Sequence, residues 1–411
     1  MDSLTTTISL LLRIPVLAVC AFALTLSNTT IAGEKLKIFI LAGQSNTVGH
    51  ARAHTIATLF QSSKTRDTGL TKMVFKEDSE VSKKILDVQL LAATQLDELT
   101  GGISNQKVKD MKPGLEKDKL EAEVKKRKDA HQDYKNRVMA SCIVSDRVYI
   151  NSIADRNKRA GKLGIGYGAS QDKIGPEYGF GLSIAQKTDG PILLIKTSWG
   201  GKSLNYNFRP PSAGKYVLSE KEKNGKKPVE EIKQNVSQFY DLMNQHVHGV
   251  LANLKDNHPA YDAKAGYEIA GFVWFQGFND QFAPEYRDNY KDNMVHFIND
   301  VRKEYKTPRM PFVIGVLGTA RTKEKVDQNA VSVAQREAAK HPKFKGNVLA
   351  VESYKDYSNY SHSIFEKGWP AHYHEWDTVG SDRPYHYLGS GAFFVRLGDS
   401  FASAMADLMA N

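Results

Sequence analysis

Cysteine is scarce in this sequence, since its 411 residues include only Cys20 and Cys142. So few thiols exclude a disulfide-stapled scaffold and a cysteine-rich zinc protein. Proline (14) and glycine (31) occur at ordinary levels, which excludes collagen-like and low-complexity chains. Repeated long apolar runs are also missing, so a polytopic membrane protein is excluded. With 41% hydrophobic and 25% charged residues, the remaining class is a globular protein with a sizeable core.

Residues 1–32 have the features of a secretory signal peptide. Arg13 supplies a positive charge, an uncharged apolar run covers 14–26, and small residues precede a cut before Gly33. A lipoprotein anchor at Cys20 and a single membrane anchor are the alternatives, but the apolar run is too short to span a bilayer. We therefore expect a secreted or periplasmic protein with no membrane span in the mature chain.

Short buried strands alternate with helical segments along most of the chain. Strands are expected at 35–41, 191–197, 269–275, 311–317 and 346–351. Helices are expected at 176–187, 229–254, 286–305, 331–340 and 390–409. This alternation predicts an α/β fold with a doubly wound, mostly parallel sheet flanked by helices. In such sheets the active site gathers at the carboxyl ends of the strands, where the polar turns of this sequence lie.

Residues 64–160 interrupt this pattern. They contain 21 Lys and Arg and 16 Asp and Glu among 97 residues, so more than a third is charged. Helices are expected at 81–99 and 115–138, which predicts an inserted, charged, mostly helical hairpin. The remaining domain then comprises 33–63 plus 161–411. A solvated hairpin and an arm that binds an anionic partner both fit this segment; the sequence holds no nucleic-acid-binding motif.

Two of the polar blocks suit acyl-transfer chemistry. Gly-Gln-Ser-Asn follows the first strand and exposes Ser45 on a tight turn, as a nucleophile requires. His386 lies in a loop before the last helix, four residues after Asp382, and a histidine beside a carboxylate suits a general base. Each block alone is also typical of an ordinary turn or helix cap.

Two further blocks offer hydrogen-bond donors. Gly200 and Gly201 follow the second strand, where paired glycines let backbone N–H groups approach a ligand. Gln276 and Asn279 follow the third strand and could donate from side-chain amides to an oxyanion. Beside them, the pair Trp274–Phe275 could line an acyl pocket, stack on a sugar or pack in the core.

A His-rich stretch offers a possible metal site. His372, His374 and Glu375 have a spacing that permits metal ligation, but such runs in loops are more often without metal. We therefore expect no metal.

The order of these motifs resembles the sialate O-acetylesterase and acetylxylan esterase branch of the SGNH hydrolases. The resemblance covers roughly 35–55 and 161–410, and leaves the inserted segment unexplained. The motifs that carry it are Gly43-Gln44-Ser45-Asn46, Gly175-Pro176-Glu177-Tyr178-Gly179, Trp199-Gly200-Gly201, Trp274-x-Gln276-Gly277-x-Asn279-Asp280 and Tyr385-His386-Tyr387-x-Gly389-Ser390. It implies an SGNH or flavodoxin-like fold.

The resemblance also implies roles for individual residues. Ser45 is the implied nucleophile and His386 the implied base. The implied oxyanion and substrate-binding groups are the Ser45 amide, Gly200, Gly201, Gln276, Asn279 and Gln44.

Two departures from the family pattern affect the site. Phe278 stands where many members have Glu, and Arg383 occupies the position three residues before the histidine, where the superfamily has Asp. We favour Asp382 as the third triad member, with Asp280 as the alternative acid; Glu177, or no carboxylate at all, is the remaining alternative.

Together these features predict a carboxylic ester hydrolase. The expected reaction is removal of O-acetyl groups from carbohydrates, either sialic acid or an acetylated polysaccharide, through an acyl-serine intermediate. No cofactor is required, the expected partner is the acetylated carbohydrate, and no nucleic acid is expected. The alternatives are a catalytically inactive glycan-binding relative and an envelope protein that uses the charged hairpin for interaction.

Overall fold

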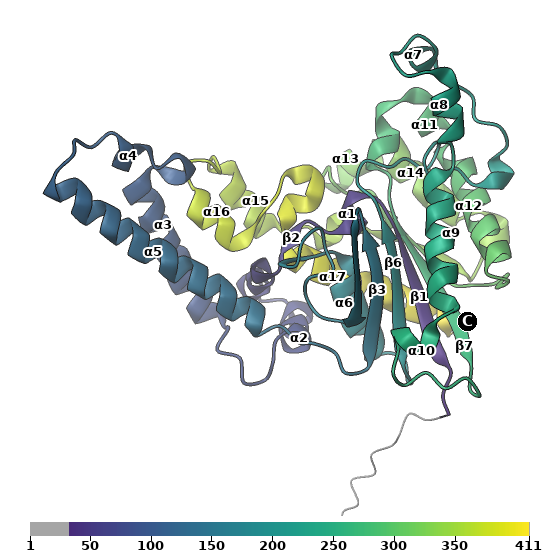
Figure 1. Ribbon diagram of the computed structural model, residues 1–411, viewed down its shortest axis with the longest axis horizontal. Coiled ribbons are helices and arrows are strands. Elements are labelled where there is room, and N and C mark those ends of the chain that lie inside the picture. Colours follow the sequence, from purple (N-terminus) through teal and green to yellow (C-terminus); the bar gives the residue numbers. More distant parts are fainter. Residues whose placement is uncertain (1–32, 411) are drawn as a thin grey trace, which may run out of the picture.

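The computed structural model describes residues 33–410. The predicted signal peptide, residues 1–32, lies outside the described residues. A seven-stranded sheet forms the centre of the protein, in the order β4-β3-β6-β1-β7-β8-β9 (Figure 1). Its strands are β1 (Leu36–Gly43), β3 (Val148–Ala154), β4 (Asn157–Lys162), β6 (Ile192–Ser198), β7 (Tyr267–Phe275), β8 (Phe312–Val316) and β9 (Val348–Glu352). All neighbours pair in parallel except β3 and β4. The predicted doubly wound, mostly parallel sheet is therefore confirmed.

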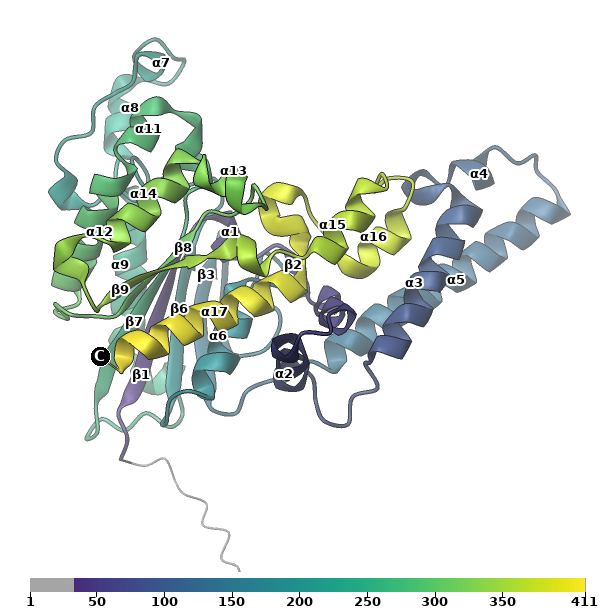
Figure 2. The ribbon, with the colours of Figure 1, turned by 180° about the vertical axis from the view of Figure 1, so that it is seen from behind.

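Helices cover both faces of this sheet. Those on or beside it are α6 (Pro176–Ala185), α8 (Val229–Gln234), α9 (Gln238–Leu251), α10 (Leu254–Asn257), α11 (Pro284–Asp288), α12 (Tyr290–Glu304), α13 (Lys323–Asp327), α14 (Ala330–Ala339) and α17 (Gly391–Met409). In Figure 1, α9 and α10 lie in front of the strands, and the reverse view in Figure 2 shows α17 and α6 across the other face.

The central strand β1 shows why both faces are covered. Ile38 and Ile40 pack in the apolar cluster under α9 and α12, whereas Phe39 and Leu41 pack in the cluster under α6 and α17. Side chains alternate between the two faces of a strand, so a strand buried on both sides must be apolar at consecutive positions. The uninterrupted apolar run in the sequence is the consequence.

The structure also contains shorter elements. They are α1 (Ser45–Val48), α2 (Thr65–Val74), α4 (Gln106–Lys109), α7 (Glu220–Lys223), α15 (Asn359–Glu366) and α16 (Tyr373–Val379). A small antiparallel pair is formed by β2 (Ala51–Arg52) and β5 (Lys173–Ile174). Turns of 3₁₀-helix are η1 (Ala53–Gln61), η2 (Gly102–Ser104), η3 (Pro211–Ala213), η4 (Phe278–Phe282), η5 (Pro342–Phe344), η6 (Ser353–Asp356) and η7 (Pro384–Gly389).

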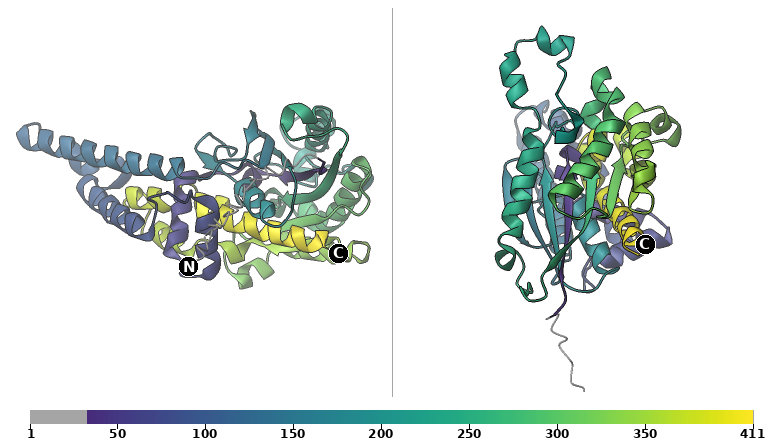
Figure 3. Two further views of the ribbon diagram at one scale, coloured as in Figure 1. Left: turned by 90° about the horizontal axis from the view of Figure 1, so that it is seen from below. Right: turned by 90° about the vertical axis from the view of Figure 1, so that its right-hand side faces the viewer.

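Two long helices project from the body. They are α3 (Lys83–Thr100) and α5 (Leu115–Ala140), and we refer to residues 83–140 as the helical arm. The arm points away from the sheet in Figure 1, and the left view of Figure 3 shows it extending beyond the strands. Residues 148–160, which the sequence analysis assigned to the inserted segment, instead contribute β3 and most of β4 to the main sheet.

The helix expected at 229–254 is interrupted. It divides into α8, α9 and α10, and Ser237 between the first two has φ +64°. The N–H of Ser237 donates to the Tyr206 carbonyl at 2.9 Å, and the N–H of Phe239 donates to the Asn207 carbonyl at 2.9 Å. The prediction of one continuous helix was wrong because these bonds to a distant loop replace the helical ones.

Candidate active site

The carboxyl ends of β1, β6 and β7 meet at one edge of the sheet. Ser45 follows β1 directly as the first residue of the single-turn helix α1. Gly43, just before it, permits this turn because a Cβ there would lie 2.2 Å from the Phe275 carbonyl oxygen of β7. The nucleophile predicted from sequence therefore occupies an N-terminal helical position, where backbone N–H groups have no partner within the helix.

The loop that carries His386 lies against the Ser45 turn. Asn46 Nδ2 donates to the Tyr385 carbonyl at 3.1 Å, which joins the residues next to Ser45 and His386. Within that loop the N–H of Leu388 donates to the Arg383 carbonyl, and Tyr387 and Leu388 both have positive φ. Ser45 and His386 are 341 residues apart in the sequence, and the fold brings their two loops together.

Asp382 is the carboxylate next to the imidazole. His386 Nδ1 lies 3.2 Å from Asp382 Oδ1, and the Arg383 N–H donates to the same oxygen at 2.7 Å. The His386 contact has hydrogen-bond distance but imperfect alignment. Burial opposes ionisation of Asp382, but the contacts with His386 and Arg383 outweigh it and lower the pKa of the carboxyl. Asp382 is thus an ionised group that can orient His386.

A second histidine, which the sequence analysis did not identify, shares this carboxylate. His50 Nδ1 lies 3.5 Å from Asp382 Oδ2, and the His50 ring stacks on His386 with centroids 4.1 Å apart and planes 3° apart. Burial, followed by the charge of His386, lowers the pKa of His50 to about 4. His50 is therefore neutral at neutral pH.

The two histidines and Asp382 also bring three possible metal ligands together. Imidazole binds a metal ion in the plane of its ring, and two stacked parallel rings share no such plane. The present arrangement therefore does not fit an ion held by both histidines. The histidines of the His-rich stretch have carboxylate partners. His374 Nδ1 pairs with Asp97 Oδ1 at 2.8 Å, and His372 Nδ1 lies 3.5 Å from Glu375.

Gly200 lies beside Ser45, but its N–H already has a partner. A Cβ on Gly200 would lie 4.0 Å from Ser45 Cβ, and the Gly200 N–H donates to Asp155 Oδ1 at 2.7 Å. The expectation of a free Gly200 donor is therefore corrected. Gly201 follows with φ +69°, and a Cβ there would lie 3.9 Å from Asn279 Nδ2, so this glycine faces the amide block.

The side-chain amides of Gln44, Gln276 and Asn279 form a hydrogen-bonded network. Gln276 Nε2 donates to the Lys202 carbonyl, Asp280 Oδ2 and Gln44 Oε1, so it is not available as an oxyanion donor, contrary to expectation. Gln44 Oε1 also accepts from the Asn279 N–H, and Gln44 Nε2 donates to Asn279 Oδ1 at 3.1 Å. Gln44 therefore fixes the orientation of the Asn279 amide, whose Nδ2 donates to no partner within residues 33–410.

The alternative acids are engaged away from His386. Asp280 is fully buried and accepts hydrogen bonds from the N–H groups of Leu204 and Asn205 and from Gln276. Burial raises the pKa of Asp280 to about 6. Glu177 is fully buried with Lys196, at 2.8 Å. Of the three carboxylates considered, the structure brings only Asp382 to His386.

Lys196 is a second residue that the sequence analysis did not single out. Its Nζ donates to the Val48 and Tyr167 carbonyls as well as to Glu177, and both charged side chains have no exposed surface. The Val48 carbonyl lies at the end of α1, so its hydrogen bond with Lys196 fixes the helical turn that begins at Ser45. A lysine inside the apolar run of β6 is the sequence signal that could have revealed it.

The aromatic residues at the site are not those predicted. Trp274 and Phe275, considered for an acyl pocket or sugar stacking, are 0% and 2% exposed and belong to the core. They are the last residues of β7, whose side chains enter the two helix layers. The accessible rings beside the site instead belong to Phe278, Phe282 and Tyr385.

Comparison with known proteins identifies a family. A family model described as a carbohydrate esterase, sialic acid-specific acetylesterase, matches residues 130–358. This range contains Gly200 and Asn279, while Ser45 and His386 lie outside it. No curated protein matches the chain.

Several solved structures are similar to the chain at low identity. A protein from Arabidopsis thaliana has 14% identity and a TM-score of 0.43, with 90% of this chain and 98% of that chain covered. A carbohydrate acetylesterase from Xanthomonas citri has 11% identity and a TM-score of 0.36, covering 77% and 49%. NanS has 10% identity and a TM-score of 0.36, covering 78% of each chain. Because the family model spans more than half of the chain, the protein belongs to the sialic acid-specific acetylesterase family of carbohydrate esterases and is a carboxylic ester hydrolase.

Proposed function

We propose that the protein is a secreted serine esterase that removes O-acetyl groups from sialic acid or an acetylated polysaccharide through an acyl-serine intermediate. The observation that carries this proposal is the position of the Asp382–His386 pair. Its loop is hydrogen-bonded to the residue after Ser45, and Asp382 Oδ1 lies 3.2 Å from His386 Nδ1. That contact leaves Nε2 of His386 for the nucleophile, the arrangement of a serine triad.

In the acylation step, His386 Nε2 takes the proton of the Ser45 hydroxyl as its oxygen attacks the acetyl carbonyl carbon. The carbonyl π electrons move to oxygen and form a tetrahedral oxyanion. When this intermediate collapses, the bond to the sugar oxygen breaks and the sugar leaves with the proton from His386. Asp382 stays ionised throughout and stabilises the imidazolium.

Deacylation repeats the sequence with water. His386 takes a proton from water, the hydroxide adds to the acetyl-serine carbonyl, and the second intermediate releases acetate and regenerates Ser45. A neutral His50 stacked on His386 places no second positive charge beside the imidazolium, consistent with its low pKa.

The oxyanion is stabilised by donors that have no other partner among residues 33–410. Asn279 Nδ2 is the proposed side-chain donor, held by Gln44, and the N–H groups of Ser45 and Gly201 are the proposed backbone donors. Donors fixed in advance at the position of developing charge cost no reorganisation during the reaction. Gln276 and Asp280 serve this site indirectly, by holding the loop around Asn279.

Export from the cytoplasm is the second part of the proposal. It rests on the arginine and the apolar run within residues 1–32. Among residues 33–410, no helix combines the length and the apolar character needed to cross a membrane. Sequencing the amino terminus of protein recovered from outside the cytoplasm tests this: a start near Gly33 supports it, and an uncleaved chain retained in the cytoplasm contradicts it.

Acetate release tests the enzymatic part. Wild-type protein is incubated with acetylated xylans, acetylated pectins and O-acetylated sialosides, and with p-nitrophenyl acetate as a small ester. Ser45→Ala is expected to lower kcat about 10⁴-fold or more without changing the melting temperature, because triad members act as a unit. Normal turnover by a folded Ser45→Ala protein would contradict the mechanism.

A further inference from the structure

Three accessible aromatic rings extend from His386 along the surface. The Tyr385 ring lies 4.6 Å from the His386 ring, the Phe278 ring lies 6.0 Å from Tyr385, and the Phe282 ring lies 5.2 Å from Phe278. We refer to Tyr385, Phe278 and Phe282 as the aromatic row. Its members come from η7 and η4, two segments that are far apart in the sequence and lie side by side in the fold.

Two rings of the row are largely exposed and Phe278 is half-buried, and none of them packs in the core of the described chain. Phe282 is 68% exposed and Tyr385 is 45% exposed, and none of the three rings belongs to either large apolar cluster. Large rings left in water lose the free energy that burial would provide, so adjacent exposed aromatics indicate a binding surface. The rings are tilted by 40° and 77° to one another, so this surface is curved rather than flat.

The row leads into a cavity of about 590 Å³. Phe282 and Asn279 both line it, so the cavity adjoins the proposed oxyanion donor. The rest of its wall combines apolar side chains with charges of both signs: Ile232, Pro284, Tyr286, Lys226, Lys227, Glu220, Glu222 and Glu285. Because neither sign dominates, the wall suits a neutral ligand with many hydroxyl groups.

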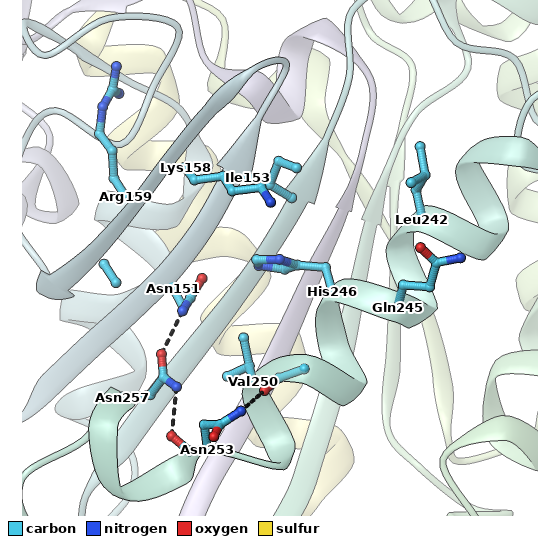
Figure 4. A pocket seen from close by; sticks show the side chains of 12 residues that line it. Asn151, Ile153, Lys158, Arg159, Leu242, Gln245, His246, Val250, Asn253 and Asn257 are labelled. Carbon is cyan, nitrogen blue, oxygen red and sulfur yellow. Dashed lines mark hydrogen bonds between the residues drawn. The ribbon is translucent and has the colours of Figure 1, made fainter.

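A second cavity of about 590 Å³ provides a comparison (Figure 4). It lies between β3, β4 and the helices α9 and α10, where Asn151 donates to Asn257 and His246 extends toward the sheet. No aromatic side chain other than His246 lines it, and it includes none of the proposed active-site residues. Size alone therefore does not distinguish a substrate site here; the aromatic row and the shared Asn279 do.

We infer that the aromatic row and the cavity beyond it bind an extended sugar chain, so that the substrate is an acetylated oligosaccharide or polysaccharide rather than a single sugar. The acetylated unit lies at Ser45, and neighbouring units lie over Phe278 and Phe282. Pyranose rings present apolar C–H faces that pack on aromatic rings, while their hydroxyl groups reach the polar cavity wall. This inference rests on the proposed esterase function.

The ratio of kcat/KM for acetylated xylotetraose to kcat/KM for p-nitrophenyl acetate tests the inference. Phe282→Ala is expected to lower this ratio about fivefold to tenfold, mainly through KM for the tetrasaccharide, because one aromatic contact is lost. Phe282→Trp is expected to retain the wild-type ratio. Tyr267→Ala is the matched control, since Tyr267 is a 41% exposed aromatic residue at the opposite end of β7, and it should not change the ratio.

Two results would overturn the inference. One is an unchanged ratio in Phe282→Ala, and the other is wild-type hydrolysis of mono-acetylated xylose as efficient as that of the tetrasaccharide. Calorimetric measurement of the binding of unacetylated xylotetraose to Ser45→Ala protein distinguishes a failure of this inference from a failure of the catalytic proposal. Binding that Phe282→Ala weakens supports the row even if no ester is hydrolysed, and absence of binding counts against it even in an active esterase.

Discussion

The active-site edge of the sheet and the helical arm are both rich in polar side chains, but they use them differently. At the edge, Gln44, Gln276 and Asp280 are bound to one another, and Asn279 Nδ2 has no partner among the described residues. On the arm, the charged groups are exposed and pair locally, as Lys125 does with Asp129 at 2.6 Å. Density of charge therefore does not mark the site; a free donor held rigidly by satisfied neighbours does.

The base of the arm differs from its tip. Asp377 of α16 accepts Lys135 Nζ at 2.7 Å and Arg52 at 2.9 Å, and His131 Nε2 lies 3.3 Å away. Asp377 is 5% exposed, and the contacts with His131 and Lys135 outweigh the effect of burial and lower the pKa of its carboxyl. The loop with Asp382 and His386 follows α16 directly, so the attachment of the arm and the catalytic loop share one short segment.

After Ser45→Ala, Asp382→Asn is the change at the active-site edge with the largest expected effect. It is expected to lower kcat between about 100-fold and about 10,000-fold at neutral pH, because His386 loses the carboxylate that orients it and stabilises its cation. Asp280→Asn is the comparison, with a smaller loss, since Asp280 contacts no atom of His386. Steady-state kinetics of both variants with p-nitrophenyl acetate provide the measurement. A nearly normal Asp382→Asn beside an inactive Asp280→Asn would assign the acid to Asp280 instead.

Asp377→Asn tests the difference between the base and the tip of the arm. Removing this charge leaves Lys135 buried without a counterion, and the free energy of unfolding is expected to fall by about 3 kcal/mol. Asp129→Asn breaks an exposed pair on the same helix and should cost at most about 0.5 kcal/mol. Urea denaturation of both variants measures these values. Equal losses would show that burial does not distinguish the two parts of the arm.

A pH dependence of the free energy of unfolding is also expected, and it originates at His54. His54 is fully buried, and burial lowers its pKa to about 4 from an ordinary 6.5. Between these values the unfolded chain binds a proton that the native protein does not, so the free energy of unfolding increases with pH across this window. His50 acts in the same direction, and Asp280, with a raised pKa of about 6, opposes it over part of the range.

His54→Gln should therefore make this slope shallower. The test is urea denaturation of the wild type and the variant at both ends of the window. A wild-type slope of opposite sign, or a slope that His54→Gln leaves unchanged, would contradict the assignment.

The sequence allowed the sheet to be predicted where its strands are buried on both faces. The strand at 35–41 and the helix at 390–409 correspond closely to β1 and α17, because long apolar patterns determine them. β3 and β4 were missed for a physical reason. β3 alternates buried and half-buried residues, and β4, at the sheet edge, contains Asn157, Lys158 and Arg159. Neither forms an apolar run, and both lie in a highly charged stretch.

The candidate site was predicted in part. Short motifs at strand ends pointed to Ser45 and Asn279, because parallel strands bring their carboxyl ends together, and a histidine near a carboxylate before the last helix pointed to His386 and Asp382. Which donors are free could not be read from the sequence, since Asp155 reaches Gly200 only in the folded chain. The contact of His50 with Asp382 is likewise a product of tertiary packing, and a single histidine four residues beyond the Ser-Asn turn carries no distinctive pattern.

Covalent labelling of Ser45 tests the central claim most directly. Wild-type protein is treated with a fluorophosphonate, digested and examined by mass spectrometry, with Ser45→Ala as the control. The account predicts one modified peptide, containing Ser45, loss of esterase activity in proportion to labelling, and no corresponding adduct in Ser45→Ala. An active wild-type enzyme that is labelled on another serine, or that is inactivated without modification of Ser45, would contradict it.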